Sequence, residues 1–119
     1  MSTLLTIVIP THNRPLLLIQ AIESALASTT STTEILVIDD GSEPAVNQAS
    51  LQRRFGPQIK VHRNQTCMGI YQVRKKGCEL ASGQYVYQLD DDDRLVAGSL
   101  DIALAALIEH DLDVLYLNV

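Results

Sequence analysis

The sequence predicts a single α/β domain with a mainly parallel sheet and helices on both faces, similar to a Rossmann fold. Short apolar runs rich in β-branched residues alternate with segments of helical periodicity. This alternation indicates successive βαβ units with right-handed crossovers. Apolar residues make up 46% of the chain and charged residues 19%, which is the balance of a folded globular domain.

The first βα unit is predicted in the first thirty residues. A nearly continuous apolar run at 4–9 is typical of a strand that is covered on both faces. Pro15 suits the first turn of a helix, and apolar residues then recur at spacings of three and four as far as Leu26. A run of Ser and Thr at 28–33 predicts a loop.

The later elements follow from the same criteria. A second β-branched run at 34–38 is stopped by turn-forming residues, so it predicts a strand. The remaining expectations are a short helix at 46–55, a weak third strand at 59–62, a helix at 70–81, a fourth strand at 85–89, a helix at 98–110 and a fifth strand at 114–117.

Charge and hydropathy narrow the classes of function. The net charge of -5 and only nine Lys and Arg argue against binding to a nucleic-acid backbone. No apolar run is long enough for a membrane span, and the start lacks the basic residues of a signal peptide, so the cytoplasm, with the inner face of a membrane as an option, is the expected location. Cys67 and Cys78 form neither a disulfide framework nor a zinc motif and are expected to be packing residues.

Polar residues collect where the predicted strands end, at 11–14, 39–42 and 90–93. Ligands bind at this edge in parallel α/β sheets. Four successive aspartates repel one another by roughly 1 kcal/mol per close pair in water and about 4 at an effective dielectric constant near 20. Mg²⁺ or Mn²⁺ would relieve that cost, and together with substrate phosphates it needs only one or two protein carboxylates. The loop therefore predicts a metal-bridged diphosphate, and a solvated acidic turn that caps the next helix is the alternative.

Two other groups of polar residues could contact a ligand. The stretch 39–42 suits either a ligand contact or a plain turn that caps a helix. Among the cations at 74–76, one or two could pair with phosphate while the rest face solvent. The three histidines are too scattered along the chain to form a metal site.

Together these segments resemble the start of a family 2 glycosyltransferase domain of the type called GT-A. Five motifs occur in the family's order across nearly the whole chain, at 7–14, 37–42, 74–77, 81–85 and 89–93. Two positions depart from the family pattern. Ala97 stands where a Pro is common after the acidic loop, and a small residue or Gly is often found where Gln65 follows Asn64.

The resemblance implies a set of residues that bind the nucleotide sugar. Asp40 would contact the base and Asp39 would support the nucleotide, while His12 takes the place of a family Tyr that stacks on the base. Asp91 would lie near the ribose or sugar, and Arg74 would face the diphosphate or sugar. The expected nucleotide-sugar-binding residues are Pro10, Thr11, His12, Asn13, Arg14, Asp39, Asp40, Arg74, Asp90 and Asp91.

The resemblance also implies a reaction and a metal. Asp90 to Asp92 would form the Asp-x-Asp motif, with Asp92 as the main ligand of Mn²⁺ or Mg²⁺ and Asp90 as a second ligand. A nucleotide-diphosphate sugar, expected to be a UDP-sugar, would donate its sugar to the hydroxyl of a saccharide or lipid-linked acceptor. The catalytic base is expected beyond Val119, so 1–119 would be one truncated domain without its acceptor-binding half. Such a domain would expose the surface that its missing half covers, which also allows a homo-oligomer.

Three other classes share parts of this pattern. A signalling receiver domain also carries an acid pair, but the pair should end the first strand and a later Lys is needed, whereas no Lys follows Lys76. A nucleotidyltransferase should carry a Gly-rich loop after the first strand, and 11–14 lacks one. A non-catalytic nucleotide-binding or metal-binding module would use the same cleft and stays open as an alternative.

Overall fold

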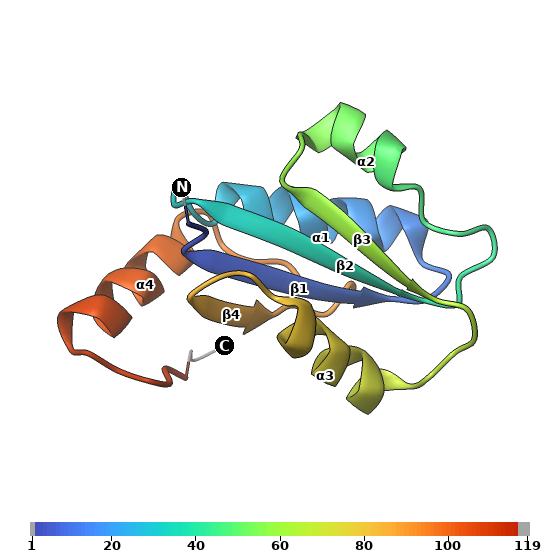
Figure 1. Cartoon of the computed structure of the whole chain (residues 1–119). Helices are drawn as coiled ribbons and strands as arrows, with labels where there is room; N and C mark the ends of the chain where they lie inside the picture. Colours follow the sequence, from blue (N-terminus) through green and yellow to red (C-terminus); the bar gives the residue numbers. More distant parts are fainter. Residues whose placement is uncertain (1, 117–119) are drawn as a thin grey trace.

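The computed structural model describes residues 2–116 and contains one parallel sheet with helices on both faces (Figure 1). The strands lie side by side in the order β3-β2-β1-β4, and each neighbouring pair is parallel. Their bounds are β1 (Leu5–Thr11), β2 (Thr33–Asp40), β3 (Ile59–Asn64) and β4 (Tyr85–Gln88). Because the strands are parallel, their carboxyl ends share one edge of the sheet, as the sequence predicted.

Four helices alternate with the strands: α1 (Pro15–Ala27), α2 (Gln48–Phe55), α3 (Ile70–Leu80) and α4 (Ser99–Glu109). Alternate residues of β1 point to opposite faces, so Ile7 and Ile9 pack in the larger core with buried residues of α1, α2 and α4. Val8 faces the other way and packs against Val73 of α3. The helices therefore cover both faces of the sheet, which confirms the predicted fold class.

Two glycines allow close approach between elements. An added Cβ at Gly77 in α3 would lie 2.3 Å from a methyl carbon of Val8, which is fully buried. A Cβ at Gly83 would lie 2.5 Å from the backbone nitrogen of Thr6. The missing side chains thus let α3, and the turn before β4, pack directly on β1.

The fifth strand predicted at 114–117 is not found in the described residues. Val114 to Tyr116 have no strand structure, and Leu117 lies outside the described residues. After α4 the backbone nitrogen of Leu112 donates to the carbonyl of Leu107, and Leu115 contacts the core through its side chain. Of the described residues of this run, Leu115 thus packs through its side chain, whereas Val114 and Tyr116 are exposed.

The prediction for the cysteines was wrong, because both thiols are exposed. Cys67 lies in the loop before α3, and Cys78 lies in that helix, where its sulfur accepts a hydrogen bond from the Gln88 amide at 3.3 Å. Among the helices of residues 2–116, none has the length and apolar character needed to cross a bilayer.

Candidate functional site

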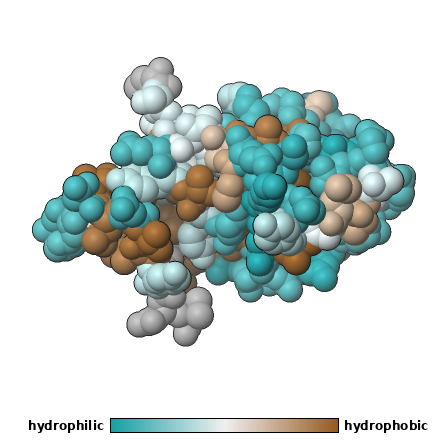
Figure 2. Space-filling model, turned by 60° about the horizontal axis from the view of Figure 1, so that its bottom comes forward, coloured by the Kyte–Doolittle hydropathy of each residue, from teal (hydrophilic) through white to brown (hydrophobic). Residues whose placement is uncertain are grey.

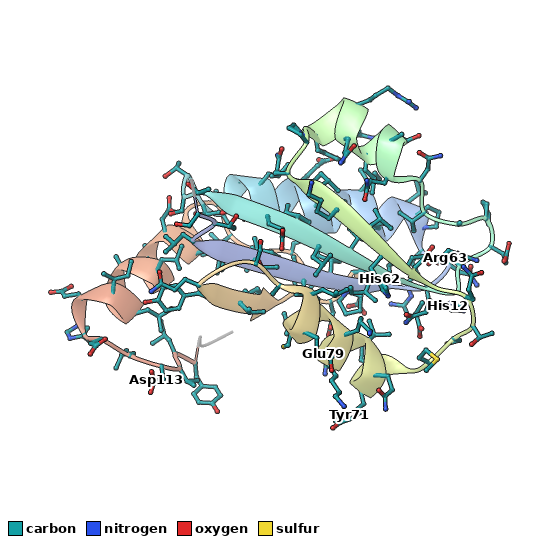
Figure 3. All side chains as sticks on the ribbon, in the orientation of Figure 1. His12, His62, Arg63, Tyr71, Glu79 and Asp113 are labelled. Carbon is teal, nitrogen blue, oxygen red and sulfur yellow. The ribbon has the colours of Figure 1, made fainter. Side chains whose placement is uncertain are left out.

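A cavity of about 350 Å³ opens at the carboxyl ends of β1, β2 and β4, beside the first turns of α3. Figure 3 shows His12 and Arg63 at this edge of the sheet, while Asp113 lies at the opposite end of the molecule. The lining residues are Pro10, Thr11, His12, Arg14, Asp40, Cys67, Gly69, Ile70, Val73, Arg74, Asp90, Asp91 and Asp92.

Asp39 lies beneath this edge and does not line the cavity. Its fully buried carboxylate accepts hydrogen bonds from the backbone nitrogens of Ser42 and Val46, both at 2.9 Å. Arg63 of β3 adds an ion pair at 2.9 Å. Burial alone would raise the pKa of Asp39, but the hydrogen bonds from Ser42, Val46 and Arg63 lower it below its ordinary value. This carboxylate therefore holds the loop after β2 in place as an anion.

Asp40 faces the other side of the sheet and fixes the loop before α3. One carboxylate oxygen accepts from the Asn64 amide at 3.0 Å and the Met68 nitrogen at 2.8 Å. The other accepts from the Gly69 nitrogen at 3.0 Å and the Cys67 thiol at 3.2 Å. Burial raises the pKa of Asp40, and these four donors outweigh it, so the pKa is lowered. The hydrogen bond from the Cys67 thiol to Asp40 raises the pKa of that thiol.

The His12 ring is held in one orientation on the cavity wall. Its Nδ1 lies 2.7 Å from the carbonyl oxygen of Asp40, and its Nε2 lies 3.1 Å from the amide nitrogen of Asn13. A carbonyl only accepts, so Nδ1 carries the hydrogen and Nε2 accepts from Asn13. Asn13 also donates its backbone N–H to Ser42 and accepts from the Glu43 nitrogen, which ties the end of β1 to the loop after β2.

The four aspartates of the acidic loop divide into two groups. Asp91 is buried, and it accepts a hydrogen bond from the Thr11 hydroxyl at 2.9 Å and one from Arg14 at 3.3 Å. Asp90, Asp92 and Asp93 each offer a carboxylate oxygen, and these oxygens lie within 4.8 Å of one another. Hard carboxylate ligands at this spacing fit Mg²⁺ or Mn²⁺.

Two arginines contact the acidic loop from opposite walls. Arg74 of α3 lies 2.9 Å from an oxygen of Asp90, and Arg14 lies 3.5 Å from an oxygen of Asp92. Four aspartates and two arginines line the cavity, so its wall carries net negative charge when His12 is neutral. A phosphate-bearing ligand would be repelled there unless a cation bound with it.

The structure brings most of the predicted residues together. Of the predicted set, Pro10, Thr11, His12, Arg14, Asp40, Arg74, Asp90, Asp91 and Asp92 line the cavity. Asp39 is buried behind the site, and Asn13 lines a neighbouring hollow of about 270 Å³ next to α1 and α2.

Sequence reasoning missed the wall formed by Cys67, Gly69, Ile70 and Val73, and it did not single out Asp93 as a member of the metal group. A Gly directly before a predicted helix was the available signal for this wall. Gly69 adopts a φ of 87° at this point, which favours glycine.

The chain belongs to glycosyl transferase family 2, because the model of that family matches residues 6–119. It is similar to the putative colanic acid biosynthesis glycosyl transferase WcaA of Escherichia coli, with 34% identity over 87% of this chain and 38% of that protein. It is also similar to the GalNAc(5)-diNAcBac-PP-undecaprenol beta-1,3-glucosyltransferase of Campylobacter jejuni, with 36% identity over 81% of this chain and 32% of that protein. The chain thus spans less than half the length of these relatives.

Solved structures show the same fold. The crystal structure of TarS 1-349 from S. aureus covers 92% of this chain at 25% identity, with a TM-score of 0.74, and this chain covers 33% of it. Further crystal structures of TarS 1-349 are complexes with UDP-GlcNAc and with UDP. The expected membership of a GT-A glycosyltransferase family is therefore confirmed.

Proposed function

We propose that residues 1–119 form the donor-binding part of a glycosyltransferase that takes its sugar from a UDP-sugar. The observation that carries this proposal is the shared cavity, in which the acidic loop, Arg74 and the His12 ring meet at one edge of a parallel sheet. The UDP and UDP-GlcNAc complexes of the similar TarS structures support a uridine nucleotide as the ligand class.

Each wall of the cavity has a role in this proposal. Asp92, with Asp90, would hold Mn²⁺ or Mg²⁺, and Asp93 is close enough to contribute a third oxygen. Arg74 would pair with the diphosphate or sugar, and the oriented His12 ring would stack on the base. Bound at the aspartates, a divalent cation would neutralise the negative charge that grows on the leaving diphosphate.

Asp39 and Asp40 act differently in this proposal. The Asp40 carboxylate already accepts four hydrogen bonds from residues 64–69. Its effect on the base would therefore be mainly indirect: the carboxylate holds this loop in place, and the backbone carbonyl of Asp40 orients the His12 ring. Asp39 supports the nucleotide site from below by holding the loop of residues 41–46. Asp91 supports the acidic loop through Thr11.

The acceptor and the catalytic base belong to the whole protein. The names of two relatives specify glucosyl transfer to undecaprenol-linked saccharides, which supports a saccharide or lipid-linked acceptor. Transfer needs a base within hydrogen-bond reach of the acceptor hydroxyl. The aspartates of the cavity are either bonded within the protein or assigned to the metal, so we place the base in a part of the protein outside 1–119.

Titration calorimetry with three ligands tests the donor site. UDP, UMP and uridine are titrated into the purified protein with and without Mn²⁺. A metal-bridged diphosphate requires that Mn²⁺ strengthen the binding of UDP by at least about tenfold and leave the affinity for uridine unchanged. Equal binding of all three ligands, or no effect of Mn²⁺ on UDP, would contradict the proposed site.

A further inference from the structure

Arg14 connects the end of β1 to the acidic loop across the cavity. It lies directly before Pro15, the first residue of α1, and its side chain is 51% exposed. One guanidinium nitrogen lies 3.3 Å from Asp91 and 3.5 Å from Asp92. The same cation thus contacts two successive carboxylates.

The two carboxylates have different surroundings. The side chain of Asp91 is only 8% exposed, and the Thr11 hydroxyl holds its other oxygen. The side chain of Asp92 is 55% exposed and belongs to the group of carboxylates that can hold a metal. Arg14 is therefore anchored at Asp91 and lies beside Asp92, which could also bind a metal ion.

We propose that Arg14 is an internal counter-ion of Asp91 and Asp92 in the acidic loop, beside the Arg74–Asp90 pair, and couples metal binding to donor binding. Without metal, its guanidinium neutralises Asp92. When a divalent cation binds Asp92, the guanidinium loses that partner, stays anchored at Asp91 and becomes available to the diphosphate of the donor. This inference rests on the proposed function, because it assumes that Asp92 binds the metal.

The positive charge of Arg14 should have opposite effects on the binding of the metal and on the binding of the diphosphate. A fixed positive charge about 4 Å from a carboxylate opposes the binding of a second cation to that carboxylate. The planar guanidinium also matches the geometry of a phosphate, so the same charge favours the binding of a diphosphate. Removing it should strengthen metal binding and weaken nucleotide binding.

Arg94 supplies a matched control. It follows Asp93 directly in the chain and carries the same charge, but its guanidinium donates to the side chain of Gln20 and to none of the loop's carboxylates in the described structure. Arg94→Gln therefore removes a nearby charge without removing a carboxylate contact. A general effect of net charge would appear equally in Arg94→Gln and in Arg14→Gln.

The experiment measures Mn²⁺ affinity by the electron paramagnetic resonance signal of free Mn²⁺, and UDP affinity by calorimetry at saturating Mn²⁺. In Arg14→Gln we expect Mn²⁺ to bind about three- to tenfold more tightly and UDP to bind at least about threefold more weakly, with both affinities of Arg94→Gln near wild type. Changes of the same sign in Arg14→Gln, unchanged affinities, or an equal effect in Arg94→Gln would overturn the role of Arg14. If the wild-type protein bound UDP but no Mn²⁺, the metal site itself would be wrong, and this inference would fail with it.

Discussion

At the scale of single residues, Asp39 and Asp40 at the end of β2 stabilise two different loops. Successive side chains of a strand point to opposite faces, so Asp39 reaches the loop after β2 and Asp40 reaches the loop before α3. The sequence predicted the position of this acid pair at the ligand-binding edge. It did not predict that Asp39 would be buried away from the cavity, because the partner that holds it, Arg63, lies on another strand.

Because the pKa values of Asp39 and Asp40 are lowered, we expect the folded protein to lose stability in acid. The pKa of each is lowered in the folded protein, so the stabilisation they provide is fully present above the unfolded pKa of about 3.9 and is lost as the pH falls below it towards the folded pKa. We expect the midpoint of urea unfolding to fall steeply below about pH 4. Asp39→Asn, which cannot titrate at this position, should show a shallower dependence. A midpoint that is constant down to pH 3, or an equal slope in Asp39→Asn, would count against this explanation.

At the scale of elements, periodicity and turn residues located most of the structure. Each predicted helix is present, and the first four predicted strands form the sheet. The strand expected at 114–117 failed over its described part, because a short apolar run has the same pattern whether it pairs as a strand or packs through its side chains. The wall of the cavity before α3 was missed because long-range hydrogen bonds to Asp40 place it, and Gly69, the local signal before the helix, indicates only a turn.

The packing of α3 on the sheet depends on Gly77. Alanine normally stabilises a helix relative to glycine by about 1 kcal/mol. At this position the new Cβ would meet the buried Val8, so we expect Gly77→Ala to destabilise the protein by about 1–3 kcal/mol. Lys75→Ala, at an exposed position of the same helix, is the control and should stay close to wild type. Urea unfolding measures both variants, and a stabilised Gly77→Ala would show that α3 has room to move away from β1.

At the scale of the whole molecule, the candidate site and a hollow lined largely by apolar residues lie at opposite edges of the sheet. The cavity lies at the carboxyl edge of the sheet, while Figure 2 shows apolar side chains gathered at the end formed by α4 and the residues after it. A second hollow there is lined by residues of β4 and α4 together with 113–115. The sequence could predict the polar edge because parallel strands bring their carboxyl ends together, whereas the detailed shape of the cavity depends on contacts between distant segments.

The most direct test of a metal-bound donor site is Mn²⁺-dependent binding of UDP to Asp92→Asn. Asp92 belongs to the carboxylate group of the acidic loop, whereas Asp113 is an exposed aspartate at the opposite end of the molecule, so Asp113→Asn is the matched control. We predict that Asp92→Asn weakens Mn²⁺ binding by at least about tenfold and abolishes the effect of Mn²⁺ on UDP affinity, while Asp113→Asn behaves as wild type. Unchanged Mn²⁺ and UDP binding in folded Asp92→Asn would contradict the assignment of the acidic loop as the metal site.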